Sequence, residues 1–513
     1  MVENVVEPPC VRKKGSALEK SFLPAILIPG NTVQTMQLYN TLTKQKEPFT
    51  PIHKGKVSMY TCGPTVYGKI HIGNIRAYLL ADILRRALTE EGFEVRHIKN
   101  ITDVGHLTRD DLSQGDSGED KVEQKAREER VTPQEITERY EQYFRETEEA
   151  MNILPAHLFP RATKHISQMI KLIETLIEKG HAYERNGNVF LDVTSFDTYG
   201  NLSGNTLEKL QAGARIEPHP DKRNDWDFAL WLAAKPDHVM RWESPWSVGY
   251  PGWHIECSAM SMAYLGESFD IHTGGEDNIF PHHEAEIAQS ECATGHRFVR
   301  YWVHGRHLLF DGVKMSKSKG NLYTLEDIEA RGFSAMDLRL ALLSSHYRSQ
   351  MNFTWKAMEQ AKKNRHTITK AVHALEAYEE SASPEDPTPF DAKPFATKFS
   401  AAVADDLNTP LALSIVYELF SEAQTVMETQ TLSPEDARGI LAAWKKMNAV
   451  LGLRVPPRTE ADPLPEDVQR LLAERQDARE KKDYAASDRL RDEIAALGYT
   501  VEDTATGQQA KKY

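Results

Sequence analysis

Cysteine is scarce in this chain of 513 residues, which contains only Cys10, Cys62, Cys257 and Cys292. The four are scattered widely, so they do not form the closely spaced framework of a small disulfide-bonded protein. In a reducing compartment such cysteines are buried apolar residues, metal ligands or nucleophiles. A buried thiol is the commonest role for each one taken alone, so a metal site needs further partners.

Long apolar runs are also absent. No segment approaches the roughly 20 apolar residues of a membrane helix, and the N-terminus has only the short apolar patch FLPAILIP. It lacks the charged start and small-residue cleavage site of an export signal, so we expect a cytoplasmic protein with no membrane partner. The net charge of −13 argues against a protein coated with nucleic acid, but it does not exclude a local basic track.

A strand–loop–helix–strand pattern begins after Gly55. Residues 57–62 (VSMYTC) predict a short buried strand, and the loop GPTVYGKIHIGN follows it. A helix is predicted from near Asn74 to Gly92, because its apolar residues recur four apart, and residues 93–101 offer a second strand. This unit opens a parallel nucleotide-binding fold, so we predict an α/β protein with a Rossmann-like parallel-sheet catalytic domain.

The remaining segments suggest the order of the domains. After about residue 355 the pattern is almost all helical, with Pro-rich linkers at 382–394 and 456–465. We therefore predict an inserted connective domain, followed by an α-helical bundle and a small C-terminal domain with two helices. The predicted boundaries are a poorly ordered extension at 1–35, the two halves of the catalytic domain at 36–145 and 241–310, the connective insertion at 146–240, a region at 311–355 that contains the lysine-rich loop KMSKS, the helical bundle at 356–455 and the C-terminal domain at 456–513.

The first candidate site is the tetrapeptide HIGN at residues 71–74, between the first strand and the helix. Backbone N–H groups and the positive end of a helix attract phosphate at such a position. Gly63 and Gly73 allow a ligand to approach closely, and His71 and Asn74 can donate hydrogen bonds. A histidine near a helix start is more often structural, so the tetrapeptide alone is weak evidence.

The second candidate is KMSKSKGN, Lys314–Asn321, which follows a predicted hairpin turned on Asp311 and Gly312. Its lysines make a cationic loop that can close over a triphosphate and stabilise charge in a transition state. A solvated Lys-rich turn is the alternative for this loop alone. Together with HIGN, in this order and separated by a long insertion, it matches the paired ATP signatures of class I aminoacyl-tRNA synthetases.

The third candidate is the stretch FPHHEAE. Pro281 suits a first helical turn, so His282 and Glu286, four apart, are predicted to point to the same side. His283 and Glu284 are predicted to point elsewhere. A lone His-x-x-x-Glu pair is usually a solvated helix face, so this pair also needs partners.

Two thiols supply those partners. Cys62 ends the first strand, and Cys257, in GWHIECSAM, opens another segment of the predicted core. With His282 and Glu286 they make a four-ligand set suited to zinc. Zinc favours a thiolate over a hydroxyl and promotes deprotonation of a bound thiol, whereas pocket shape discriminates by only about 1–3 kcal/mol per small group. The set therefore predicts a cysteine-specific enzyme with no need for a proofreading domain.

From about Gln37 to the C-terminus the chain resembles the cysteinyl-tRNA synthetases. The matching segments include YNTLTKQKEPF, YTCGPTVYGKIHIGN, GWHIECSAM, FPHHEAEIAQS, KMSKSKGN, HYRSQMNF and DDLNTP. The resemblance implies a ligase that forms cysteinyl-adenylate from L-cysteine and Mg-ATP, with one zinc ion per chain. We expect a monomer, although nothing in the sequence fixes the oligomeric state. It also implies transfer of the cysteinyl group to the 3′-terminal ribose of tRNA(Cys). The helices after residue 355 would grip the tRNA stem, and the Arg- and Lys-bearing tail suits backbone contacts and anticodon recognition.

The resemblance also implies roles for individual residues. The zinc ligands would be Cys62, Cys257, His282 and Glu286. The residues at ATP and the reacting phosphates would be His71, Gly73, Asn74, Lys314 and Lys317. The cysteine pocket would be lined by Gly63, Thr65, Trp253, His272 and Asp277. Asp277 would meet the ammonium group, and plain core packing is the alternative role for Trp253 and His272.

Two features depart from the family pattern. Asn74 stands where the family signature commonly ends in a second histidine, and an asparagine can donate a hydrogen bond but cannot carry charge. The extension at 1–35 has no counterpart in compact family members, and the sequence suggests no function for it.

Two other interpretations stay open. A paralogous ligase could activate cysteine in the same way and pass it to a small amine such as an amino-sugar, but such ligases resemble a synthetase without the full C-terminal region. A non-catalytic RNA- or zinc-binding module is the second alternative. The intact KMSKS loop argues against it, because decay of the enzyme would erode this loop first.

Overall fold

The computed structural model describes residues 35–111, 115–206, 208–209, 220–315, 320–381, 384, 386–458, 465–504 and 507–512. The extension predicted at 1–35 therefore lies outside the described residues except for residue 35. Lys317 also lies outside them. Among the described residues, every helix is too short or too polar to cross a membrane.

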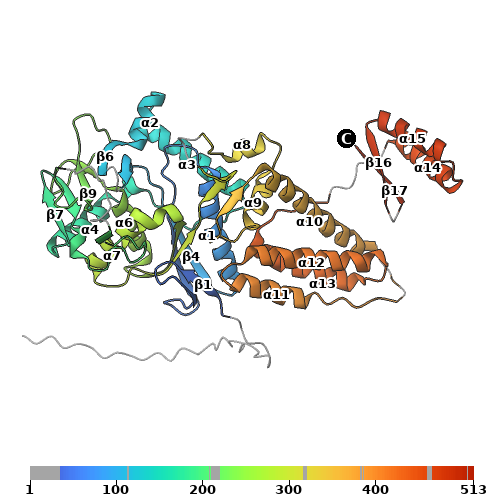
Figure 1. The fold of residues 1–513 in the computed structure, drawn as a ribbon, viewed down its shortest axis with the longest axis horizontal. Helices are drawn as coiled ribbons and strands as arrows, with labels where there is room; N and C mark the ends of the chain where they lie inside the picture. The colour runs from blue at the N-terminus through green and yellow to red at the C-terminus, as the bar shows by residue number, and fades with distance from the viewer. Residues whose placement is uncertain are drawn as a thin grey trace, which may run out of the picture. The chain divides into compact units, whose positions relative to one another are not determined.

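A four-stranded parallel sheet forms the centre of the catalytic part. It consists of β3 (Lys56–Thr61), β4 (Glu94–Lys99), β11 (Phe269–Gly275) and β12 (Val299–Gly305), in the order β12-β11-β3-β4. Helix α1 (Ile72–Glu90) connects β3 to β4 (Figure 1). The predicted strand–loop–helix–strand unit and the Rossmann-like fold class are thus confirmed.

Helix α1 packs its predicted apolar face against this sheet. Both runs of apolar residues at four-residue spacing are buried, from Ile75 to Ile83 and from Leu80 to Leu88. Gly92 follows the helix with φ of +90°, the left-handed conformation expected of it. The helix begins at Ile72, slightly before the predicted start, because His71 is its N-cap.

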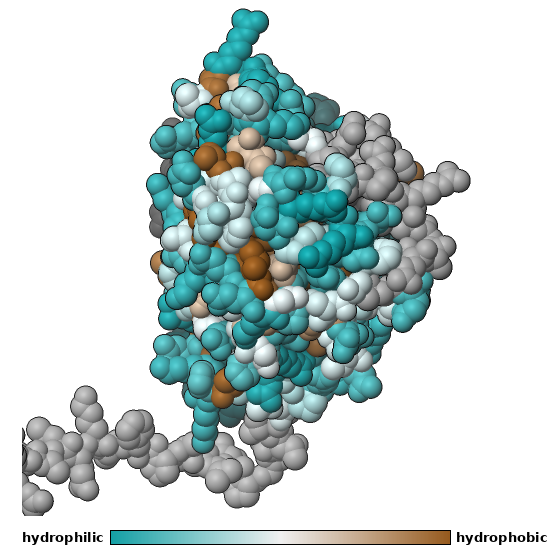
Figure 2. All heavy atoms as spheres, turned by 90° about the vertical axis from the view of Figure 1, so that its left-hand side faces the viewer, coloured by the Kyte–Doolittle hydropathy of each residue, from teal (hydrophilic) through white to brown (hydrophobic). Residues whose placement is uncertain are grey.

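The long connection between β4 and β11 contains ten α-helices and β-strands among the described residues. They comprise β5 (Leu107–Asp111), β6 (Gly115–Asp120), α2 (Lys121–Glu129), α3 (Pro133–Ala150), α4 (Ile166–Glu178), β7 (Ala182–Arg185), β8 (Asn188–Leu191), β9 (Phe228–Ala233), β10 (Gly249–Pro251) and α6 (Trp253–Leu265). Strands β7 to β10 form an antiparallel sheet in the order β10-β9-β8-β7. Seen from the side that carries β7, the described surface is mostly hydrophilic with isolated hydrophobic residues (Figure 2).

Smaller elements complete the catalytic part. They are β1 (Gln37–Asn40), β2 (Gln45–Pro48), α7 (Glu284–Thr294), β13 (Leu308–Phe310), β14 (Val313–Lys314), α8 (Leu325–Glu329), α9 (Ala335–Leu343) and β15 (Met351–Phe353). The predicted hairpin is confirmed, since β13 pairs with β14 in antiparallel register. Asp311 and Gly312, at its turn, have φ of 45° and 79°.

The region after β15 is helical, as predicted. It contains α10 (Trp355–Ser381), α11 (Lys393–Ala404), α12 (Thr409–Glu428) and α13 (Pro434–Leu451). The C-terminal domain contains the two predicted helices, α14 (Glu466–Glu480) and α15 (Tyr484–Ala496). It also contains a hairpin of β16 (Tyr499–Thr504) and β17 (Gly507–Lys512) that was not predicted, because a polar sequence such as GQQAKK lacks the apolar alternation of a strand. The domain boundaries drawn from the sequence stay predictions.

A buried ion pair ties α1 to the helices that surround it. Arg339 donates to Asp82 Oδ2 at 2.6 Å, and both side chains are fully buried. The same guanidinium donates to the carbonyl oxygens of Leu451 at 2.7 Å and Met151 at 2.8 Å. It thereby joins α9 to the C-terminal ends of α13 and α3, and it fixes the helix that carries His71 at its N-terminus.

Replacing Arg339 with methionine is expected to lower the free energy of unfolding by about 3 kcal/mol. Asp82 would keep a buried charge after losing one partner, a loss that costs about 3–5 kcal/mol. Arg86, whose Nε lies 2.9 Å from Asp82, offsets part of the cost. Denaturant unfolding measures the change. Arg438→Met, which breaks the exposed pair with Glu379, is the control and should cost at most about 1 kcal/mol; equal losses in the two variants would contradict the prediction.

Candidate active site

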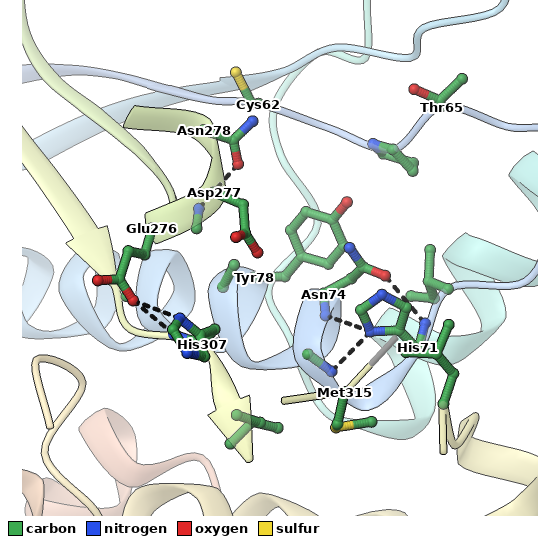
Figure 3. A pocket seen from close by; sticks show the side chains of 18 of the residues that line it. Cys62, Thr65, His71, Asn74, Tyr78, Glu276, Asp277, Asn278, His307 and Met315 are labelled. Atoms are coloured by element: carbon green, nitrogen blue, oxygen red, sulfur yellow. Dashed lines mark hydrogen bonds and ion pairs between the residues drawn. The ribbon is translucent and has the colours of Figure 1, made fainter. Parts of the chain in front are cut away.

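A cavity of about 510 Å³ opens at the carboxyl ends of the parallel strands. The loops after β3, β11 and β12 line it, together with residues of the β13–β14 hairpin (Figure 3). Crevices at this end of an open parallel sheet are the usual ligand sites of such folds. Of the predicted site residues, it is lined by Cys62, Gly63, Thr65, His71, Gly73, Asn74, Trp253, Asp277 and Lys314.

The HIGN segment forms a reciprocal cap at the start of α1. His71 Nδ1 accepts hydrogen bonds from the backbone N–H groups of Gly73 at 3.1 Å and Asn74 at 3.4 Å. Asn74 Oδ1 in turn accepts from His71 N at 3.1 Å. A side chain at Gly73 would lie 2.9 Å from the His71 ring, so glycine is needed for this arrangement. The cap fixes the imidazole at the edge of the cavity (Figure 3).

Lys314 and Asp277 form an ion pair across the mouth of the cavity. Lys314 Nζ donates to Asp277 Oδ1 at 3.0 Å, and both side chains are more than half exposed. Asp277 is the predicted partner of the substrate ammonium group, and in this structure Lys314 holds that carboxylate. An exposed pair contributes at most about 1 kcal/mol, so a bound ligand can displace it.

The structure brings the four predicted metal ligands together. Cys62 Sγ lies 3.8 Å from Cys257 Sγ and 3.6 Å from Glu286 Oε1, and His282 Nε2 lies 3.2 Å from the same oxygen. All four side chains are buried, and their ligand atoms lie within 4.8 Å of one another. They come from the end of β3, from α6, from the irregular turn Ile279–His283 and from the first turn of α7.

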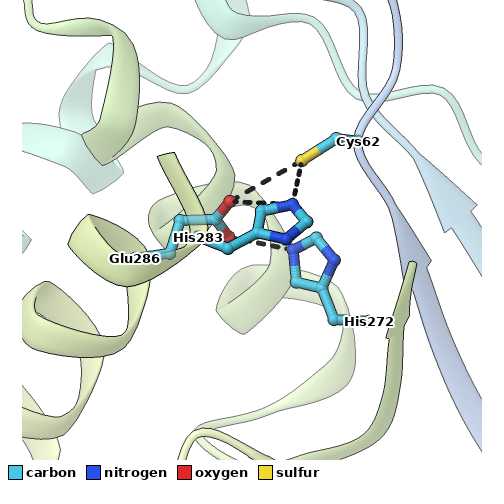
Figure 4. A group of neighbouring side chains, drawn as sticks. All are labelled: Cys62, His272, His283 and Glu286. Atoms are coloured by element: carbon cyan, nitrogen blue, oxygen red, sulfur yellow. Dashed lines mark hydrogen bonds and ion pairs between the residues drawn. The ribbon is translucent and has the colours of Figure 1, made fainter. Parts of the chain in front are cut away.

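The prediction that His283 points elsewhere is wrong. Its Nε2 lies 3.2 Å from Cys62 Sγ, and Cys62, His272, His283 and Glu286 form a second group with metal-ligand spacing (Figure 4). The reason is that His283 lies three residues before Glu286, and residues three or four apart share one face of a helix. The backbone is helical at His283, with φ −69° and ψ −30°, so both histidines face Glu286. Helical spacing therefore does not decide which histidine faces the thiols.

Other predicted positions divide between the cavity and its surroundings. Glu284 does point elsewhere, since its carboxylate accepts from Ser203 N at 2.8 Å. His272 is not among the cavity-lining residues; its ring is fully buried, with Nε2 3.0 Å from Glu286 Oε2, and it stacks on Trp302. It therefore supports the metal group rather than the wall of the cavity.

Burial favours the neutral forms of the two thiols and the two imidazoles. It raises the pKa of the Cys62 and Cys257 thiols and lowers the pKa of His282 and His283. A neutral imidazole is the form that binds a metal, whereas the thiols must lose their protons on binding. The group thus has the chemistry of a metal site.

His106 is a cavity residue that the sequence reasoning missed. It stacks on Trp253 with 4.0 Å between ring centroids and 6° between planes. Its position just after the second strand, in NITDVGH, was the available signal, because the carboxyl ends of parallel strands meet at one edge of the sheet.

Comparison with known proteins identifies the family. Residues 48–363 match the family model "tRNA synthetases class I (C) catalytic domain", 398–455 match the "DALR domain", and 461–510 match the "Cysteinyl-tRNA ligase anticodon binding domain". The cysteine–tRNA ligase of Deinococcus radiodurans is 44% identical over 485 residues, which cover 93% of this chain and 96% of that protein. The chain belongs to the cysteinyl-tRNA synthetase family.

Further relatives of this synthetase agree with that result. The cysteine–tRNA ligase of Thermus thermophilus is 45% identical over 479 residues, covering 92% of this chain and 98% of that protein. The methionyl-tRNA synthetase of Mycobacterium tuberculosis has a TM-score of 0.54 at 16% identity, over 77% of this chain and 89% of that one. The structural likeness supports the class I synthetase fold alone.

Proposed function

We propose that this cysteine–tRNA ligase selects its amino acid with a zinc ion held by Cys62, Cys257, His282 and Glu286. Its family gives the reaction: ATP-dependent activation of cysteine and transfer to tRNA(Cys). The observation that carries the zinc proposal is the burial of the four ligand atoms within 4.8 Å of one another, with Cys62 also lining the cavity.

The donor set fits zinc better than a harder metal. Two thiolates, an imidazole and a carboxylate are ligands that suit zinc, whereas magnesium or calcium prefers oxygen ligands. When bound, zinc would hold the substrate sulfur as a thiolate, a bond that serine cannot form. This accounts for selection of cysteine beyond what pocket shape supplies.

The residues around the cavity would have different roles in the first step, the formation of cysteinyl-adenylate. Asp277 would accept hydrogen bonds from the substrate ammonium group, and its exposed ion pair with Lys314 is weak enough to break when ATP binds. Lys314 and Lys317 are then available for the phosphates of Mg-ATP, beside His71 at the helix start. The cysteine carboxylate oxygen forms a bond to the α-phosphorus while the bond to pyrophosphate breaks, so positioning and charge stabilisation carry the step. A terminal ribose hydroxyl of the tRNA then takes the acyl group and AMP leaves.

The C-terminal region favours tRNA over a small amine as the acceptor. The match over residues 461–510 is to an anticodon-binding domain, a part that the small-amine alternative would not need. That the protein is a cytoplasmic monomer stays a prediction from its sequence.

Metal analysis combined with cysteine-dependent ATP–pyrophosphate exchange tests the proposal. We expect one zinc per chain, loss of exchange after removal of zinc with a chelator, and recovery when zinc is returned. Serine is expected to support exchange more poorly than cysteine by more than the about 200-fold that pocket shape supplies. Full exchange by the metal-free protein would refute the role of zinc.

A further inference from the structure

The loop after β4 brings an imidazole, His106, into the wall of the cavity. Gly105, which precedes it, has φ of +81°, and a side chain there would lie 2.7 Å from the carbonyl oxygen of Pro251. Gly105 N also donates to Asp120 Oδ2 at 2.6 Å. The close approach and the hydrogen bond fix the backbone from which the His106 ring extends.

The two ring nitrogens of His106 have different partners. Nε2 contacts Lys121 Nζ, and Nδ1 lies 2.7 Å from Thr65 Oγ1. A lysine ammonium has donors and no acceptor, so Nε2 accepts and the proton of the neutral ring lies on Nδ1. Nδ1–H therefore donates to Thr65 Oγ1. Because the hydroxyl oxygen accepts this bond, its own proton is directed toward a different acceptor.

The substrate offers one acceptor that fits. Thr65 and Cys62 both line the cavity, so a cysteine with its sulfur at the metal group would extend its α-carbon substituents into the space that Thr65 borders. The ammonium group of that cysteine can only donate hydrogen bonds, and its carboxylate can only accept them. A donating Thr65 therefore matches the carboxylate, as an accepting Asp277 matches the ammonium group.

The His106 ring has a second contact that can be separated from the hydrogen bond. It stacks on Trp253, which also stacks on His282 with 4.3 Å between centroids. Loss of the ring would disturb this stack, whereas loss of the Nδ1–H group alone would not.

We propose that His106, with its tautomer set by Lys121, is a positioning residue that directs the Thr65 hydroxyl proton toward the carboxylate of bound cysteine. Because it takes cysteine as the ligand, this role rests on the proposed function.

Binding of L-cysteine and of cysteamine, which lacks the carboxylate, to the zinc-loaded enzyme tests the role. His106→Phe keeps the ring on Trp253 and removes the Nδ1–H donor. It should weaken cysteine binding by up to about tenfold, the effect of losing the Thr65 hydrogen bond to the charged carboxylate altogether, and leave cysteamine binding unchanged. His106→Asn, which keeps a donor near the Nδ1 position and removes the ring, should retain more of the cysteine affinity. Lys121→Met should also weaken cysteine binding, although it leaves the His106 ring in place.

A double-mutant cycle with Thr65→Val separates the hydrogen-bonding role of His106 from its packing on Trp253. Once Thr65→Val has removed the hydroxyl, adding His106→Phe should cause no further loss of cysteine affinity. Additive losses, or equal weakening of cysteine and cysteamine by His106→Phe, would overturn the proposal. If the His106 variants fail to fold, Lys121→Met tests the same hydrogen bond, and unchanged cysteine affinity in that variant would also overturn the proposal. Failure of the proposed function itself would appear in the unaltered protein, as missing zinc or missing exchange.

Discussion

Replacing Cys257 with serine is expected to remove the bound zinc and with it nearly all cysteine-dependent pyrophosphate exchange. Cys257 is 1% exposed, and its sulfur lies 3.8 Å from that of Cys62. Serine offers a hydroxyl that zinc binds poorly compared with a thiolate. Even changes to residues that only support a ligand cost about 10–100-fold in metal affinity, so loss of a ligand should cost at least about 100-fold. Zinc content after gel filtration and the exchange rate at saturating cysteine are the measurements.

Cys292→Ser is the matched control for this experiment. Cys292 is also a buried thiol, at 6% exposure on α7, but it belongs to neither group with metal-ligand spacing. The control should keep its zinc and its exchange activity. A loss of zinc in both variants would indicate a general folding defect rather than loss of a ligand.

His283→Gln decides between the two ligand groups. Cys62 and Glu286 are common to both, so they cannot distinguish them. If Cys257 and His282 are ligands, His283→Gln should retain zinc, and the absorption of the cobalt-substituted protein should report two thiolates. Zinc retained by Cys257→Ser but lost in His283→Gln would assign the site to His272 and His283 instead.

The metal group shows where sequence reasoning succeeds and where it stops. Cys62 follows β3, Cys257 lies near the start of α6 and Glu286 lies in the first turn of α7, positions that strand ends and helix starts mark in the sequence. The choice between His282 and His283 could not be made from spacing, because they lie four and three residues before Glu286 and both spacings share one helix face. The β16–β17 hairpin was missed for a different reason, since its pairing follows from local backbone contacts between polar residues.

Sequence reasoning found cavity residues chiefly within recognisable motifs. The HIGN and KMSKS segments are recognisable because each carries its chemistry in consecutive residues. His106 has no such local context: its importance comes from Thr65, Lys121 and Trp253, which lie on three other segments. The resemblance implied a place for His272 in the cysteine pocket; its ring does not line the cavity and lies with Nε2 3.0 Å from Glu286 Oε2.

Replacing His71 with alanine is expected to lower the rate of cysteine-dependent exchange at saturating substrates by about 10²–10³-fold, the usual effect of removing one preorganised donor to a developing charge. Because His71 Nδ1 accepts from the backbone of Gly73 and Asn74, the proton of the neutral ring lies on Nε2. That Nε2–H group is the donor that we expect to stabilise the reacting phosphates. The substitution also removes the N-cap of α1, which should cost about 1 kcal/mol of stability.

His71→Asn separates the two effects. Asparagine is among the best N-cap residues, so this variant should keep the thermal stability of the unaltered protein. Its short side chain cannot place a donor where Nε2 lies, so the exchange rate should fall about as far as in His71→Ala. Thermal unfolding and exchange kinetics on the three proteins give both quantities. Full exchange by His71→Asn would mean that His71 acts only through the cap, and that the phosphates are held by the helix start and the lysines alone.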